Sequence, residues 1–228
     1  MAALYDMSTN LLRKLYDRRI TGPAVLDCET FFPASYRYIE LWQELQNEAL
    51  SLTANLEQVP RFHELLPSQV DISANDKRDW RMFMLKAYGT NFTNNLTQCP
   101  TLARLLNETP DVLTATLSFL APHKHIPRHR GPFRGIIRCY IGLSIPCDDT
   151  GKPAAILTIN DEDHLIGNGE ILLWDDTYPH EVWNKSDKVR IALLMDIRRR
   201  NMPLDMELLS RLIISMVGAT VRVKALNE

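Results

Sequence analysis

The sequence lacks several features that would assign it to a specialised class of protein. Its 228 residues include only four cysteines, Cys28, Cys99, Cys139 and Cys147, and no two of them form a C-x-x-C pair. This spacing argues against a zinc ribbon and against a thioredoxin-type site. Scattered cysteines of this kind are typical of reduced thiols in a reducing compartment.

An excess of charge of one sign and long hydrophobic runs are also missing. Lys and Arg total 26 against 28 Asp and Glu, a formal net charge of −2, so no global field would attract nucleic acid or an anionic membrane. No stretch approaches the roughly 18 apolar residues of a membrane span, and the first residues lack the apolar region of a signal peptide. We therefore expect a cytoplasmic protein that neither binds nucleic acid nor spans a membrane.

The chain has no internal repeat, low-complexity run or linker, and its hydrophobic content of 45% is that of one globular domain. We predict a single domain over residues 1–228. It would have a helical N-terminal part to about residue 110, a β core over about 111–200 and a C-terminal helix over about 204–218.

Three segments have helical patterns. Apolar residues from Ile39 to Leu56 recur at intervals of three and four. A second helix is predicted from Pro100 to Asn107, because proline suits a first helical turn and Pro110 stops continuation. The tract LLSRLIISMV, residues 208–217, favours a helix packed on the domain over a membrane-surface or dimer helix. Peripheral membrane contact through this helix stays open.

After Pro110 the apolar period changes from about 3.6 to 2, which is typical of strands. Turn-rich stretches separate the strands, and no helical repeats that would build a parallel sheet lie between them. We therefore predict a mainly β fold with flanking helices, an antiparallel sandwich or jelly roll. The predicted strands are Val112–Leu120, Ile136–Ile145, Glu170–Trp174 and Val189–Ile197, with one or two more between Asp148 and Gly169.

Histidines are few, yet three of the six lie in PHKHIPRHRGP, as His123, His125 and His129, and His180 lies in WDDTYPHEVW. A neutral imidazole is a common ligand of iron, zinc and copper, and the mouth of a jelly roll can bring distant strands together. The alternative is a set of surface or hydrogen-bonded histidines.

Two arginines occupy the same kind of position on two predicted strands. Strand alternation places Arg138 and Tyr140 on one face, and Arg190 and Ala192 on the corresponding face of the last strand. A partly buried guanidinium needs an anionic partner. That partner is either an internal Asp or Glu or the carboxylate of a ligand.

Residues 118–146, SFLAPHKHIPRHRGPFRGIIRCYIGLSIP, carry the strongest motif, followed by GEILLWDDTYPHEVWN at 169–184 and VRIALLMD at 189–196. These segments resemble the aspartyl/asparaginyl β-hydroxylase family, which is related to the lipid A acyl-chain hydroxylases. Residues 75–89, NDKRDWRMFMLKAYG, are similar to upstream sequence of bacterial members. The resemblance implies a double-stranded β-helix (jelly roll, cupin-like) that uses Fe(II), O2 and 2-oxoglutarate.

The resemblance also implies roles for individual residues. His129 and His180 fall on the iron ligands, and Arg190 falls on the arginine that pairs with the far carboxylate of 2-oxoglutarate. Arg138 falls on a second arginine that contacts this cosubstrate, and Ser118 falls on a hydroxyl that also contacts it.

Three further positions depart from the family pattern. Tyr140 stands where close relatives have histidine, and a cosubstrate contact is expected of it by position alone. His123 stands where glycine is usual, while His125 has a counterpart in some members. We expect both histidines to lie near the ligands or in a loop, and not on the metal.

Gly131 provides no side chain at the position where most oxygenases of this type have a third, carboxylate ligand. The resemblance implies that water fills this place in animal family members, whereas lipid-hydroxylating relatives tend to keep Asp. Halogenases on the same scaffold put chloride there. Asp175 and Asp176 precede His180 by five and four residues, and either could supply a carboxylate ligand. We favour hydrogen bonding in the turn for both, since such partners orient a metal-bound imidazole.

The predicted function is hydroxylation of an unactivated carbon, with Gly131 favouring the β-carbon of an Asp, Asn or related amino-acid or peptide substrate. Hydroxylation of a lipid acyl chain is the nearest alternative, and a halogenase is a further one. A non-catalytic cupin-like module, in which the arginines bind a dicarboxylate or form internal ion pairs, also stays open.

Overall fold

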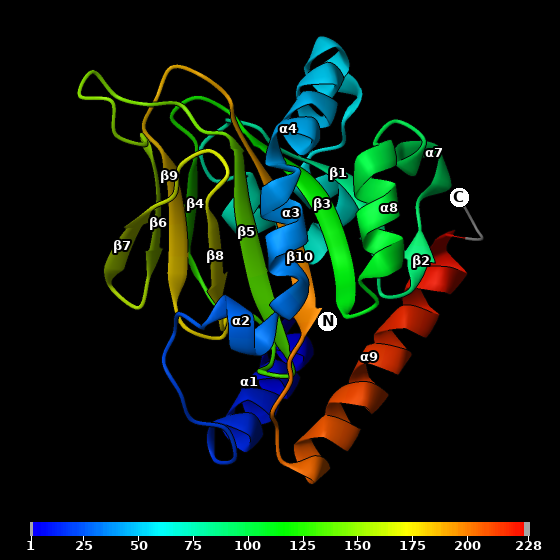
Figure 1. Cartoon of the computed structure of the whole chain (residues 1–228). Helices are drawn as coiled ribbons and strands as arrows, with labels where there is room; N and C mark the ends of the chain where they lie inside the picture. The colour runs from blue at the N-terminus through cyan, green and yellow to red at the C-terminus, as the bar shows by residue number, and fades with distance from the viewer. Residues whose placement is uncertain (1, 226–228) are drawn as a thin grey trace.

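A computed structural model shows two antiparallel sheets packed face to face, with helices around them (Figure 1). It describes the backbone of residues 2–225 and the side chains of residues 9–222, so residues 1 and 226–228 of the predicted domain lie outside the described residues. The strands are β1 (Trp80–Ala87), β2 (Thr90–Asn91), β3 (Val112–Leu120), β4 (His125–His129), β5 (Ile136–Ser144), β6 (Ala155–Ile159), β7 (Glu162–Leu165), β8 (Ile171–Trp174), β9 (His180–Asn184) and β10 (Arg190–Arg198).

The strand order identifies the topology. One sheet has the order β2-β1-β3-β10-β5-β8 and the other β4-β9-β6-β7. The chain therefore crosses between the sheets after β3, β4, β5, β7, β8 and β9, which is the winding of a double-stranded β-helix. The predicted jelly roll is confirmed.

The four predicted strands correspond to β3, β5, β8 and β10, and the two strands expected between Asp148 and Gly169 are β6 and β7. After residue 110, two strands in the structure are not predicted by the sequence, β4 and β9. Both are short and contain proline or polar residues in place of an apolar alternation. Long-range pairing between β4 and β9 forms them.

The N-terminal part also differs from the helical segment that the sequence predicts, because it contributes β1 and β2 to the larger sheet. The sequence of β1, WRMFMLKA, is rich in Met, Leu, Lys and Ala, which favour helices. In the structure β1 pairs with β3 from Trp80↔Leu120 to Ala87↔Thr114. Tertiary pairing therefore overrides local propensity here.

Helices cover the outer face of the larger sheet. The predicted helix from Ile39 to Leu56 is divided by breaks at Leu41 and Leu52, and the one at Pro100 is present. The main apolar core lies between this sheet and α3, α4 and α8 (Figure 1). The helices are α1 (Ala2–Asp17), α2 (Cys28–Phe31), η1 (Pro33–Ser35), α3 (Tyr36–Glu40), α4 (Trp42–Ser51), η2 (Leu52–Gln58), α5 (Phe62–Leu65), η3 (Pro67–Gln69), α6 (Val70–Ser73), α7 (Thr93–Leu96), α8 (Pro100–Glu108) and α9 (Leu204–Ala225).

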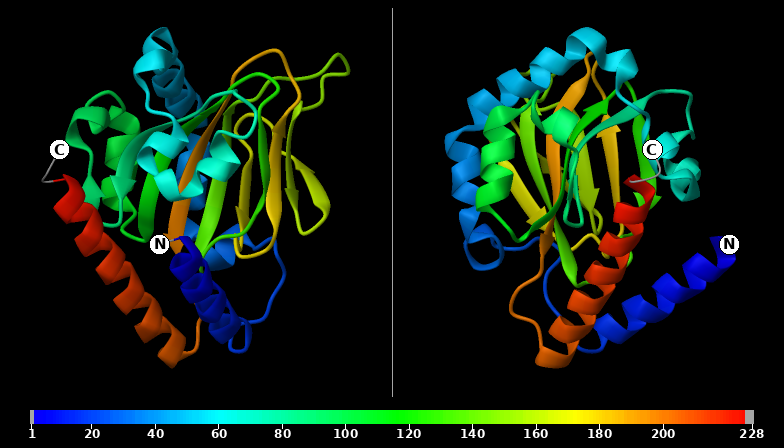
Figure 2. Two further views of the ribbon diagram at one scale, coloured as in Figure 1. Left: turned by 180° about the vertical axis from the view of Figure 1, so that it is seen from behind. Right: turned by 90° about the vertical axis from the view of Figure 1, so that its right-hand side faces the viewer.

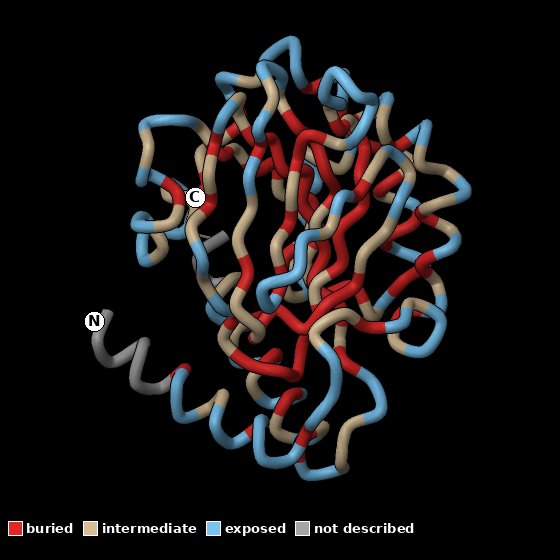
Figure 3. The backbone as a smooth tube through the Cα atoms, turned by 90° about the vertical axis from the view of Figure 1, so that its left-hand side faces the viewer, coloured by how far each residue is buried: buried red, intermediate tan, exposed pale blue. Residues whose placement is uncertain are grey.

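The first and last helices pack together at one end of the β core (Figure 2). Tyr16 of α1 shares an apolar cluster with Met206 and Ile214 of α9, and its hydroxyl lies 2.7 Å from the Ser210 hydroxyl. Figure 3 shows buried positions following the strands, while much of the described part of α1, residues 9–17, is exposed. Among the described residues, no helix has the length and apolar character needed to cross a membrane.

Candidate active site

Two histidines that are 51 positions apart in the sequence lie opposite each other in the smaller sheet. His129 ends β4, His180 begins β9, and the two residues are paired in the strand register. Their ring centroids are 4.2 Å apart, and the His180 ring also lies edge-on to Trp174. The jelly-roll winding thus brings together the two predicted iron ligands.

Backbone carbonyls set the protonation of both rings. The His129 Nδ1 lies 2.8 Å from the Pro127 carbonyl oxygen, and the His180 Nδ1 lies 3.0 Å from that of Tyr178. Since a carbonyl only accepts, each Nδ1–H donates and each Nε2 keeps its lone pair. Burial lowers the pKa of His129 to about 4 and lowers the pKa of His180 as well. Both rings are therefore neutral at neutral pH, which is the form that binds metals.

In the part of the chain that the structure describes, no third His, Cys, Asp or Glu joins these imidazoles in a metal-binding group. The Asp176 carboxylate occupies the space beside Gly131, because a Cβ atom built on Gly131 would overlap it. The Gly131 N–H also donates to the Asp176 carbonyl at 2.6 Å. The glycine therefore leaves room for a neighbouring carboxylate that arrives from another loop.

That carboxylate is buried and weakly paired. Asp176 is 1% exposed, its carboxylate oxygens form no hydrogen bond, and its ion-pair partner is the Arg138 guanidinium at 3.5 Å. Burial raises the pKa of Asp176 to about 7, against the opposing effect of Arg138. The sequence did not predict that Asp176 fills the space at Gly131, because the contact joins residues 45 positions apart.

Arg190 is the buried cation that lacks an acid. It begins β10, is 2% exposed, and has no carboxylate partner among the described residues. Its Nε forms no hydrogen bond, and its one hydrogen bond to a side chain runs from NH1 to the Ser118 hydroxyl at 3.5 Å. A buried guanidinium in this state favours an anion from outside the protein over an internal ion pair.

Two of the three other predicted cosubstrate residues, Tyr140 and Ser118, lie beside this arginine. The Arg190 guanidinium carbon is 5.5 Å from the centre of the Tyr140 ring. Ser118 is fully buried, and its hydroxyl accepts a hydrogen bond from the Trp80 indole N–H at 3.0 Å. Because that contact occupies an acceptor position, the Ser118 hydroxyl hydrogen is free to be donated. Trp80 had no predicted role, since only the pairing of β1 with β3 places it there.

Arg138 has a different environment. Its guanidinium bonds Asp196 of the neighbouring strand, from Nε at 3.0 Å, and also lies close to Asp176. Arg138 therefore has internal carboxylate partners, whereas Arg190 does not. The other two histidines of the segment 118–146 are engaged elsewhere: His123 bonds Asp187 and His125 bonds Glu181, each at 2.7 Å.

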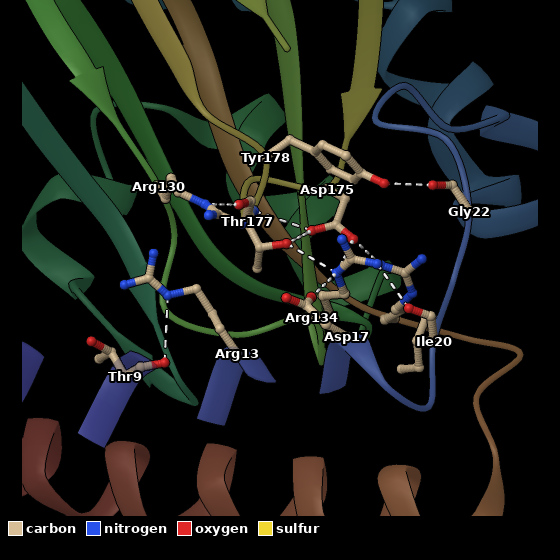
Figure 4. A network of polar contacts seen from close by, with 11 residues as sticks. Thr9, Arg13, Asp17, Ile20, Gly22, Arg130, Arg134, Asp175, Thr177 and Tyr178 are labelled. Carbon is tan, nitrogen blue, oxygen red and sulfur yellow. Dashed lines mark hydrogen bonds and ion pairs between the residues drawn. The ribbon is translucent and has the colours of Figure 1, made fainter. Parts of the chain in front are cut away.

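A polar network holds the loop in front of His180 (Figure 4). The Asp175 carboxylate accepts from Arg199 at 2.8 Å, from the Thr177 hydroxyl at 2.6 Å, and lies 3.4 Å from Arg134. Arg134 in turn bonds the Ile20 carbonyl at 2.8 Å. The loop that carries His180 is thereby attached both to the end of β10 and to the segment after α1.

Comparison with known proteins agrees with these motifs. The family model described as Aspartyl/Asparaginyl beta-hydroxylase matches residues 40–200. The chain belongs to this family. An ornithine lipid ester-linked acyl 2-hydroxylase of Rhizobium tropici is 32% identical over 183 residues, which cover 78% of this chain and 61% of the relative.

The human aspartyl/asparaginyl beta-hydroxylase is 26% identical over 146 residues, 58% of this chain and 19% of that protein. This chain therefore spans less than two thirds of the length of either relative. Among solved structures, a Pseudomonas putida prolyl-4-hydroxylase is similar, with 17% identity, a TM-score of 0.43, and coverage of 72% of this chain and 88% of that one.

The residues present fit the groups that this family implies. Two neutral imidazoles with free Nε2 lone pairs are suitable ligands for a divalent iron. The orphaned guanidinium of Arg190, with the Ser118 hydroxyl beside it, suits a carboxylate. Both features occur in the described part of the chain and arise from long-range pairing of strands.

Proposed function

We propose that this protein is an Fe(II)- and 2-oxoglutarate-dependent hydroxylase. His129 and His180 would hold the iron, and Arg190 with Ser118 would bind the far carboxylate of 2-oxoglutarate. The observation that carries the proposal is the buried Arg190 guanidinium without an acid, in the same jelly roll as the paired imidazoles. When bound, iron and 2-oxoglutarate supply, with O2, the oxidising power needed to hydroxylate an unactivated carbon.

The protein's own contribution is positioning. The Pro127 and Tyr178 carbonyls fix the two imidazole rings, and the Asp175 network fixes the loop in front of His180. Trp80 orients the Ser118 hydroxyl toward donation. Tyr140 and Trp174 are buried beside the polar residues and exclude water from them.

For the substrate we propose a lipid acyl chain. The rhizobial relative named as a lipid acyl 2-hydroxylase matches more of this chain, and at higher identity, than the human relative does. Gly131 supports a second candidate, the β-carbon of an Asp or Asn residue, because the resemblance associates a missing third carboxylate with that group of substrates.

Anaerobic titration tests the cofactor assignment. Fe(II) added with 2-oxoglutarate should produce a weak visible absorption band that His129→Ala and His180→Ala abolish. His123→Ala, at an exposed histidine bonded to Asp187, is the matched control and should keep the band. A wild-type protein without a band would contradict the proposal. Substrate-dependent succinate formation, with a mass gain of one oxygen atom, then distinguishes acyl lipids from Asp- and Asn-containing peptides.

A further inference from the structure

The last helix exposes a row of large apolar side chains. Leu204, Leu208, Leu212 and Met216 of α9 are 72%, 58%, 57% and 54% exposed. They recur at intervals of four residues, so they lie along one side of the helix. We call these four residues the α9 stripe.

The opposite side of α9 is buried against the active-site end of the molecule. Met206 and Ile214 share an apolar cluster with Phe133, which lies in the loop that follows His129. A Cβ atom on Gly135 of the same loop would overlap the Ser210 hydroxyl, so the loop and the helix are in close contact. Only the thickness of one helix, about 10 Å, separates the stripe from this loop.

The neighbouring helix also exposes apolar side chains and positive charge. Leu11 and Leu15 of α1 are 71% and 42% exposed. Lys14 lies on the same side of α1, three residues from Leu11, and Arg18 follows directly after the last residue of the helix, Asp17. Figure 2 shows α1 and α9 meeting at one end of the molecule, where Arg19 bonds Asp205 at 2.8 Å.

Among the described residues of α1, of the turn that follows it and of α9, the charges without a partner of opposite sign are positive. Each described acid on them has an arginine partner: Asp17 with Arg134, Asp205 with Arg19, and Glu207 with Arg211. The structure gives no carboxylate partner to three exposed cations among its described side chains, namely Lys14, Arg18 and Arg222. An apolar stripe beside unpaired cations matches the interface of an anionic bilayer.

The size of the stripe argues against a second protein as the occupant. It runs from Leu204 to Met216, about 18 Å by about 10 Å, which gives about 180 Å². A stable protein interface takes about 800 Å² from each partner. A fluid bilayer needs no such area and accepts an interfacial helix to a depth of about 5–10 Å.

We propose that the α9 stripe, with the outer face of α1, docks this protein on the surface of a bilayer that contains anionic lipid. The inference rests on the proposed function and deepens it, because an enzyme that hydroxylates lipid acyl chains would bind its substrate at the membrane surface. The α9 stripe lies on the side of α9 that faces away from the loop that follows His129. Docking would not cross the bilayer.

Vesicle flotation of the full chain without added metal tests the surface separately from catalysis. The vesicles are phosphatidylcholine mixed with phosphatidylglycerol, or phosphatidylcholine alone. The wild-type protein should bind the mixed vesicles more strongly, and less so at high salt. Leu208→Ser combined with Leu212→Ser should lower the partition coefficient at least about tenfold.

The matched control replaces two aliphatic residues exposed elsewhere, Leu66→Ser with Val70→Ser, which are 46% and 43% exposed in the wild-type protein. Control binding should equal wild type, and thermal melts should show all three proteins folded. Absence of wild-type binding, or equal binding by the stripe variant, would overturn the proposal. So would a wild-type dimer that the stripe variant converts to monomer in analytical ultracentrifugation. The 2-oxoglutarate affinity of the stripe variant, measured separately, reports on the proposed function alone.

Discussion

At the scale of single residues, replacing the two inward arginines should have different effects: one replacement should weaken cosubstrate binding, and the other should lower the stability of the fold. Arg190 has no carboxylate partner among the described residues, so its replacement by Met leaves no described acid without its cation. Losing a charged contact to a ligand in a desolvated site costs about 2 kcal/mol or more. We expect Arg190→Met to raise the Kd for 2-oxoglutarate at least about 30-fold with little change in stability. Titration of the Fe(II)-loaded protein measures this Kd.

Arg190→Lys should restore only part of the affinity, because an ammonium lacks the bidentate fork. An unchanged Kd in the folded Arg190→Met protein, together with a lowered Tm, would show that Arg190 serves the fold and not the cosubstrate.

Arg138→Met should act mainly on stability. It leaves two acids, the buried Asp176 and its neighbour Asp196, without their cation. We expect a loss of about 2 kcal/mol, below the full value for a buried pair because the side chain is 29% exposed. Urea unfolding gives this free energy. A larger effect on 2-oxoglutarate affinity than that of Arg190→Met would reverse the roles we assign.

Gly131 offers a steric test of the same region. In Gly131→Ala the new methyl group meets the Asp176 carboxylate, which we expect to cost about 1–3 kcal/mol. Asp176→Ala in the same chain removes the opposing group, so the double variant should be more stable than additivity of the single changes predicts. A double-mutant cycle of thermal melts measures the coupling, and strict additivity would refute the contact.

At the scale of elements, Lys124 ties β4 to the segment after α6. Its side chain is fully buried, and its ammonium donates to Ser73, Asn75 and Asp76 at 2.6–2.7 Å. Lys124→Met leaves Asp76 without its cation, and we expect a loss of about 3 kcal/mol. The exposed Lys152→Met is the control and should change the free energy of unfolding by less than about 0.5 kcal/mol.

The sequence predicts well those elements whose pattern is contained in their own residues. The alternation in β3 and β10 and the proline at the start of α8 define these elements without help from the rest of the chain. The sequence does not predict the two strands that carry the proposed iron ligands, because β4 and β9 are stabilised by pairing with each other and not by their own composition. Sequence motifs nevertheless located His129 and His180, since family resemblance depends on residue identity.

The finer arrangement of the site was beyond sequence reasoning for a related reason. The Trp80–Ser118 bond and the place of Asp176 beside Gly131 join distant segments. Alternation along a strand predicted that both arginines face inward, but it could not tell which one has an acid opposite. Only the register that pairs Arg138 with Asp196 separates them.

At the scale of the whole molecule, the cofactors should stabilise the fold by mass action. Ligands at about 100 times their Kd add about 2.7 kcal/mol, which for a chain of this size raises Tm by about 5–10 °C. We expect this shift when Fe(II) and 2-oxoglutarate are added anaerobically to chelator-treated protein. The Arg190→Met protein should keep the increase in Tm that is due to iron and lose the increase that is due to 2-oxoglutarate. If neither ligand raised the Tm of the wild-type protein, the proposed binding site would be contradicted.

The position of β10 has a consequence for how this protein is made. It is the last of the described strands in sequence order, yet it lies between β3 and β5 in the larger sheet. While the ribosome is still adding residues before Arg190, the facing edges of β3 and β5 have no strand between them, and both strands are apolar. The nascent chain thus carries two unpaired strand edges until β10 has been synthesised, and it is most exposed to aggregation or chaperone capture in that interval.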